Sequence, residues 1–145
     1  MKEARGDLWD YPADVVVITT NGTIKSNGAC VMGRGCALEA TKLFPGIARA
    51  LGRQIAEHGN HAGRIPMYNI GRKLVSFPVK HAWYEKASIE LIERSARELV
   101  ELADLWKGCS FVMPRPGCGN GHLDWADVRP VIEPILDDRF TVITF

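Results

Sequence analysis

The chain has 145 residues, of which 46% are hydrophobic and 24% charged, a composition typical of one soluble globular domain. Its 18 basic and 17 acidic residues give a formal net charge of +1, which argues against strong non-specific binding to nucleic acid. No apolar run approaches the ~18 residues of a membrane span, and the first ten residues hold no apolar signal-peptide core. Four cysteines without a C-x-x-C pair favour free thiols in the cytoplasm.

The first part of the chain predicts a strand followed by two helices. Residues 13–20 contain the unbroken apolar run Val15 to Ile18, which is typical of a strand buried on both faces. A turn-rich loop follows over 21–28. Helices are predicted over 33–44 and 47–59, the second ending at a glycine.

The second part of the chain predicts further strands and helices in alternation. We expect two short strands within 64–79 around Gly71 and Arg72. Residues 88–106 form the clearest helix, because their apolar side chains repeat every three or four positions. A strand over 109–114, a helix over 124–138 and a strand over 140–145 complete the chain. Pro130 and Pro134 predict a kink in that last helix.

Alternating strands and helices predict a three-layer α/β/α domain with a central sheet. In such folds ligands bind at the carboxyl ends of the strands. Two glycine-rich loops follow predicted strands, at residues 28–35 and 117–121. Their backbone amides can approach a ligand closely, and a helix beginning after the first loop favours an anion. The two loops would suit a diphosphate, although tight turns alone would also explain the glycines.

Neither standard nucleotide motif is present. The sequence has no G-x-x-x-x-G-K-[ST], and Gly33 and Gly35 lack the third glycine of G-x-G-x-x-G. Mononucleotide hydrolysis and NAD binding of the Rossmann type are therefore both disfavoured.

Three side chains have a functional and a structural interpretation. Cys118 could be a nucleophile, or a zinc ligand with His122, Cys30 and Cys36, but these spacings match no standard site, and a compact residue packed under the glycine loop is favoured. Lys80, at the end of a predicted strand, could bind phosphate or attack a sugar carbon, or be an ordinary surface lysine. Asp7 could accept a hydrogen bond from a ligand amino group, or serve in a turn.

Several stretches together resemble the macro domain, an ADP-ribose-binding α/β/α module, over nearly all of residues 1–145. These stretches are GDL at 6–8, ADVVVITTNG at 13–22, GACVMGRGCALEA at 28–40 and MPRPGCGNGHLDW at 113–125. VMGRG, FPVK and the last stretch further resemble the branch that contains terminal ADP-ribose protein glycohydrolase and the DarG antitoxin. The resemblance implies a single macro domain with a central mixed sheet.

The resemblance also implies an activity and a site. Members of this branch remove ADP-ribose from protein carboxylates or from DNA bases, so a mono-ADP-ribosyl glycohydrolase connected with DNA damage is expected. Lys80 and Asn21 are the catalytic candidates, with Asp7 orienting adenine and Asn21 the distal ribose. The full set of expected ligand-binding residues is Asp7, Leu8, Thr20, Asn21, Cys30, Val31, Met32, Gly33, Arg34, Gly35, Pro116, Gly117, Cys118, Gly119, Asn120 and Gly121.

One departure from the family's pattern leaves alternatives open. The second loop has no carboxylate at Asn120 or Gly121, where the related glycohydrolase carries a catalytic Asp, and Asp124 would be a helix cap. The alternatives are a reader that binds ADP-ribose without turnover, an O-acetyl-ADP-ribose deacetylase and an ADP-ribose 1″-phosphate phosphatase. An RNA-end or nucleotide-binding module is disfavoured by the balanced charge. We expect no metal, no cofactor, no membrane partner and a monomer.

Overall fold

The computed structural model describes residues 1–145 and contains one six-stranded sheet in the order β1-β6-β5-β2-β4-β3. Five strands pair in parallel, and β3 pairs with β4 in the antiparallel sense. The predicted mixed sheet is thus confirmed. The strands are β1 (Lys2–Arg5), β2 (Val15–Asn21), β3 (Gly63–Arg64), β4 (Lys73–Lys80), β5 (Phe111–Pro114) and β6 (Phe140–Thr144).

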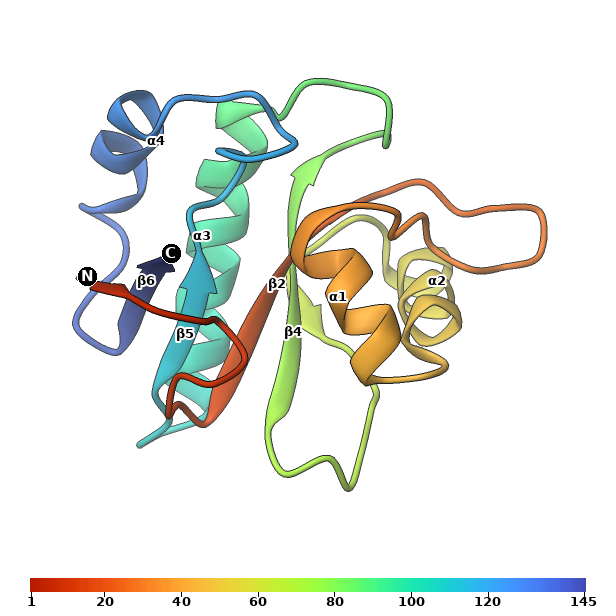
Figure 1. The fold of residues 1–145 in the computed structure, drawn as a ribbon, viewed down its shortest axis with the longest axis horizontal. Helices are drawn as coiled ribbons and strands as arrows, with labels where there is room; N and C mark the ends of the chain where they lie inside the picture. The colour runs from red at the N-terminus through yellow and green to blue at the C-terminus, as the bar shows by residue number, and fades with distance from the viewer.

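Four helices cover the sheet in two layers, which confirms the predicted α/β/α architecture. They are α1 (Gly35–Leu43), α2 (Ile47–His58), α3 (Ile89–Leu105) and α4 (Trp125–Ile132). Helices α1 and α2 lie on one side of the sheet, and α3 and α4 lie on the other (Figure 1). None of the four has the length and apolar character that crossing a membrane requires.

Strand β2 shows why the apolar run in the sequence is unbroken. Val15 and Val17 belong to the core under α3 and α4, whereas Val16 and Ile18 belong to the core under α1 and α2. Successive side chains of a strand point to opposite faces, so a central strand between two helical layers needs apolar residues at every position.

The parallel pairing of the strands determines which edge of the sheet the two glycine loops share. Since β1, β6, β5, β2 and β4 run in the same direction, their carboxyl ends meet at one edge of the sheet. Both predicted glycine loops begin at this edge, after β2 and after β5. The register of β2 against β4 shifts there, because Thr20 pairs with Pro78 but Asn21 pairs with Lys80. Such irregularities re-aim side chains next to functional sites.

Two predicted elements differ from the structure. The first of the two strands expected in 64–79 is wrong, since β3 stops at Arg64 and 65–72 lie outside any strand. The last helix ends at Ile132, and not at 138. Pro134 accounts for this end, because proline has no backbone N–H to continue the helical hydrogen bonds.

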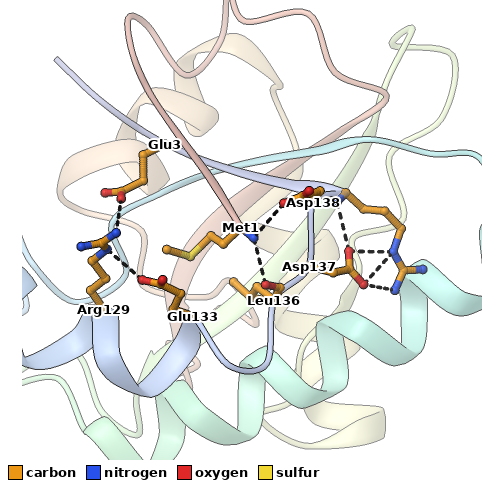
Figure 2. Close-up of polar contacts among 8 residues, drawn as sticks. Met1, Glu3, Arg129, Glu133, Leu136, Asp137 and Asp138 are labelled. Carbon is orange, nitrogen blue, oxygen red and sulfur yellow. Dashed lines mark hydrogen bonds and ion pairs between the residues drawn. The ribbon is translucent and has the colours of Figure 1, made fainter.

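Strand β1 is absent from the sequence prediction, because KEAR carries no alternating apolar pattern. Polar contacts attach this edge strand to α4 and the segment after it (Figure 2). The amino group of Met1 donates to the Leu136 carbonyl at 3.1 Å and lies 3.3 Å from the Asp138 carboxylate. Glu3 pairs with Arg129 at 3.1 Å. Hydrogen bonding to β6 and ion pairs, more than burial, therefore hold β1 in place.

Gly52→Ala should destabilise the fold. A Cβ atom on Gly52 would lie 1.9 Å from the Gly28 carbonyl oxygen and 3.1 Å from the Cys30 nitrogen, so α2 would be pushed off the loop after β2. We expect a loss of about 1–3 kcal/mol, the usual cost of overpacking, measured by urea unfolding.

Gly119→Ala is the matched control, because a Cβ at Gly119 meets no atom within 4 Å. Its free energy of unfolding should change by no more than about 0.5 kcal/mol. Equal stability of the two variants would contradict the close approach of α2.

Candidate functional site

A cleft of about 750 Å³ opens at the carboxyl edge of the sheet. Its volume lies within the range of about 300–1,000 Å³ that is usual for small-molecule sites. The ends of all five parallel strands and the start of α1 contribute to its walls. Expected site residues in these walls are Asp7, Leu8, Thr20, Asn21, Val31, Met32, Gly33, Arg34, Gly35, Lys80, Gly117, Gly119, Asn120 and Gly121.

The first loop leads into α1 and presents free backbone donors. No side chain caps α1, and the backbone N–H groups of Gly33, Arg34, Gly35 and Cys36 have no acceptor within the protein. Gly35 has φ +61°, a conformation that glycine adopts without steric cost. Unpaired N–H groups and the helix dipole together attract an anion.

The second loop is folded by its own turns and packs on α3. Leu123 N donates to the Gly117 carbonyl at 2.9 Å, and His122 N donates to the Gly119 carbonyl at 3.1 Å. Ala87 N donates to the Gly121 carbonyl at 3.0 Å and ties the loop to the segment before α3. The N–H groups of Gly119, Asn120 and Gly121 have no acceptor within the protein, so this loop is a second strip of backbone donors.

The two loops meet across the cleft. A Cβ atom built on Gly35 would lie 3.2 Å from Nδ2 of Asn120, so the start of α1 and the second loop are in contact. Backbone donors from two chain segments thus surround the same space. A diphosphate is a ligand that both strips could bind at once.

Asn21 holds the first loop to the end of β2. Its Nδ2 donates to the Val31 carbonyl at 2.9 Å, and its Oδ1 accepts from Thr23 N at 2.9 Å. Both ends of the side-chain amide therefore fix the segment that follows the strand. In this arrangement Asn21 positions the loop, and it also lines the cleft.

Lys80 joins the second loop to the segment after β4. Its Nζ donates to the Asn120 carbonyl at 3.1 Å and to the Trp83 carbonyl at 3.4 Å. The Lys80 carbonyl in turn accepts from Nδ2 of Asn60 at 3.0 Å. A positive charge thus stands at the strand end beside Asn21, held by backbone groups on both sides.

Asp7 follows β1 and serves the turn that the sequence suggests. Its Oδ1 accepts from Trp9 N at 2.8 Å, and its carbonyl accepts from Tyr11 N at 3.1 Å. The same carboxylate lines the cleft, and Oδ2 makes no hydrogen bond within the protein. The turn and the ligand contact are therefore compatible.

Three expected site residues lie outside the cleft walls, namely Cys30, Pro116 and Cys118. Cys30 is buried in the core under α1 and α2. Cys118 packs against the core under α3 and α4, and its thiol donates to the Pro116 carbonyl at 3.5 Å. Their side chains support the loops from behind. The packing role favoured for Cys118 agrees with this position.

The thiols are unsuited to nucleophilic attack at neutral pH. Burial raises the pKa of both Cys30 and Cys118 to about 11, and it also raises the pKa of Cys36. A thiol of this kind stays protonated, whereas the thiolate is the nucleophile. The zinc hypothesis has no support in the geometry, because no three His, Cys, Asp or Glu side chains are placed to hold a metal ion.

Further wall residues lie outside the expected set of ligand-binding residues. They include Trp9, Cys36, Glu39, Trp83, Tyr84, Glu85, Lys86, Arg115, His122, Thr144 and Phe145. Thr144 and Phe145 belong to the strand predicted over 140–145, whose carboxyl end lies at the same edge as the ends of the other parallel strands. Cys36, Glu39, Arg115 and His122 lie within the two glycine-loop stretches that resemble the macro domain, whereas no motif marks residues 84–86.

Cys118 should react slowly with an alkylating reagent in the folded protein at pH 8. Only the thiolate reacts, and burial raises the pKa of this thiol to about 11, so the rate should increase as the pH is raised from 8 towards 11. Mass spectrometry of the peptide that contains Cys118 measures the rate, and the protein in denaturant is the control. Rapid modification of the folded protein at pH 8 would refute the assignment.

Sequence comparison identifies related proteins of known activity. No protein-family model matches the chain. The chain is 30% identical over 142 residues to the DNA ADP-ribosyl glycohydrolase of Thermus aquaticus, a match that covers 94% of this chain and 38% of that protein. It is 26% identical over 131 residues to that of Mycobacterium tuberculosis, covering 86% and 35%. The chain thus spans little more than a third of the length of these relatives.

Solved structures that resemble this chain over nearly its whole length include DarG macrodomains and a DarTG protein. The macrodomain of Thermus aquaticus DarG has a TM-score of 0.78 and 25% identity, with 99% of this chain and 97% of that chain covered. The macrodomain of Mycobacterium tuberculosis DarG has a TM-score of 0.79 and 22% identity, covering 97% and 94%. Thermosipho africanus DarTG in complex with ADP-ribose has a TM-score of 0.78 and 21% identity, covering 97% and 40%. In sequence and fold the chain resembles the DarG macrodomains, and its fold is the macrodomain fold.

Proposed function

We propose that this chain binds ADP-ribose in the cleft and hydrolyses the bond between ADP-ribose and a DNA base. The observation that carries the proposal is the cleft itself, where two strips of free backbone donors lie beside a lysine held at the end of β4. Relatives named DNA ADP-ribosyl glycohydrolase support the choice of reaction. An ester to a protein carboxylate is a second linkage that the same cleft would accept.

The proposed binding mode assigns each part of ADP-ribose to one part of the cleft. The diphosphate lies between the N–H groups of Gly33 to Cys36 and those of Gly119 to Gly121. Asp7 accepts from the adenine amino group through its free Oδ2. The distal ribose lies near Asn21 and Lys80, which are paired neighbours on β2 and β4. Fixing the substrate in this way can supply several kcal/mol of the barrier.

Two roles for Lys80 fit this position. As a neutral nucleophile, Nζ would attack the anomeric carbon as the bond to the base breaks, and the amine proton would pass to the base. Water would then add its hydroxyl to that carbon and its proton to Nζ as the C–N bond breaks, which releases ADP-ribose. As a cation, Nζ would donate to the base as the glycosidic bond breaks, while water adds its hydroxyl to the anomeric carbon and its proton to the base. The contacts of Nζ with the Asn120 and Trp83 carbonyls support the second role, because they use it as a donor. Borohydride trapping of a covalent adduct would identify the first.

Lys80→Ala should lower kcat on an oligonucleotide carrying ADP-ribose on a base by about 100-fold or more, the range usual for loss of one donor that stabilises charge on the leaving group. Its Kd for free ADP-ribose should change by less than about fivefold, because the diphosphate contacts come from the backbone. Turnover assays and calorimetry measure the two quantities.

Lys107→Ala is the control for a lost surface charge, since Lys107 lies exposed after α3 and away from the cleft. It should retain wild-type turnover. Unchanged turnover in Lys80→Ala would refute the role of Lys80. Tight binding of ADP-ribose by the wild type without turnover of base-linked, ester-linked or O-acetyl substrates would favour a reader.

Gly121→Ala should weaken ADP-ribose binding by about tenfold or more. A Cβ atom there would lie 2.5 Å from the Gly117 carbonyl oxygen and 2.8 Å from Cβ of Ala87, so the second loop must move and its donors with it. Gly119→Ala, whose Cβ would meet no atom, leaves the backbone of the loop in place. Calorimetry with ADP-ribose should therefore show a larger loss for Gly121→Ala, and the reverse order would contradict the assigned loop structure.

The setting of this activity is also a proposal. We place all of residues 1–145 in a single macrodomain, because β1 pairs with β6 at the end of the chain. Four free cysteines support a reducing compartment, the cytoplasm. A monomeric state and the absence of strong non-specific nucleic-acid binding stay predictions from the sequence. Removal of ADP-ribose from DNA would connect the protein with DNA damage.

A further inference from the structure

Two large aromatic side chains line the cleft and are more than half exposed. Trp83 and Tyr84 follow β4 and line the cleft, yet their exposed fractions are 53% and 74%. Their rings contact each other edge to face, with centroids 5.9 Å apart. We call Trp83 and Tyr84 the rim pair. Large exposed aromatic surface has a cost in water, and where it gathers it marks a binding site.

The other tryptophans each pack on a partner elsewhere in the fold. Trp9 packs on Phe44, Trp106 stacks on Phe111, and Trp125 lies under the Arg115 guanidinium. The aromatic partner of the Trp83 ring is Tyr84, which is itself 74% exposed. The rim pair is therefore unlike the remaining indoles.

Although its ring is open, the backbone of Trp83 is fixed. Its N–H donates to Oγ1 of Thr23 at 3.0 Å, and its carbonyl accepts from Nζ of Lys80 at 3.4 Å. Glu85 closes the turn by accepting from Ala82 N at 2.7 Å. The ring is thus presented from a held turn, so stacking on it costs little ordering entropy.

The rim pair lies on the side of the cleft where the leaving base of the proposed reaction would sit. Lys80 contacts both the Asn120 carbonyl and the Trp83 carbonyl, so the rim pair is next to the group proposed to act at the glycosidic bond. Lys86 also lines the cleft, and its side chain is exposed. Exposed aromatic faces beside free cations are the combination that binds single-stranded nucleic acid, through base stacking and phosphate attraction.

We propose that the rim pair stacks a nucleobase of single-stranded DNA on the leaving side of the bond, and so selects base-linked ADP-ribose over protein-linked ADP-ribose. This inference rests on the proposed function. Lys86 attracts the neighbouring phosphate. The specificity for DNA then comes from one aromatic subsite, and a chain with a net charge of +1 needs no extended basic surface.

The test is Trp83→Ala, compared with the wild type on three ligands: a single-stranded oligonucleotide carrying ADP-ribose on a base, a glutamyl peptide carrying ADP-ribose, and free ADP-ribose. For the oligonucleotide we expect KM to rise by about 5- to 100-fold, the effect of removing one base–aromatic stack. The Kd for free ADP-ribose and the KM for the peptide should change by less than about threefold. Trp83→Phe should restore most of the oligonucleotide KM.

Tyr68→Ala is the matched control, because Tyr68 is 64% exposed and lies outside the cleft. It should match the wild type on all three ligands. Thermal melting confirms that each variant is folded. Equal losses on all three ligands would overturn the inference, since the rim pair would then contact ADP-ribose itself, and no loss on any ligand would overturn it too. A wild-type protein that binds no ADP-ribose would instead refute the proposed function.

Discussion

The parallel pairing of five strands is the constraint on which the site depends. It brings the ends of β1, β2, β4, β5 and β6 to one edge, although their last residues are up to 139 positions apart in the chain (Arg5 and Thr144). The uncapped start of α1 lies at the same edge, since the helix returns from the end of β2. The cleft lies at this edge because the five strands share one direction.

Most of the unpaired hydrogen-bond donors identified at this edge are backbone groups. Side chains of Asn21, Lys80 and Asp7 hold loops or turns as well as facing the cleft, while the free donors are N–H groups of the two loops. The glycines therefore have different tasks. Gly121 allows close packing against Gly117 and Ala87, whereas Gly119 has open space in front of it. Substitution at each position tests a different physical requirement.

The strongly patterned elements could be predicted from sequence, and the weakly patterned ones could not. β2 and α3 carry long apolar patterns, and both lie where the sequence predicts them. β1 is short, polar and on the edge, so no periodicity identifies it. The loop over 65–72 contains apolar residues that suggest a strand, but Pro66 has no backbone N–H to pair, and Ile65 is buried without a continuing strand.

The position of the cleft could be predicted from the sequence, but the directions of several side chains could not. The glycine loops and Lys80 follow strand ends and lie together, as parallel topology requires. The inward or outward direction of Cys30, Pro116 and Cys118 depends on loop turns that the sequence does not specify. The exposure of the rim pair could not be predicted, because an exposed tryptophan and a buried one look the same in a sequence.

Lys80 has a consequence for the thermodynamics of binding. Its ammonium group connects the loop after β5 to the turn after β4, and Asn21 does the same between β2 and the first loop. Four segments are thus ordered during folding, before any ligand arrives. A ligand that enters such a rigid cleft loses only its own freedom, so a small ligand should bind by fitting an existing shape, without a slow closing step.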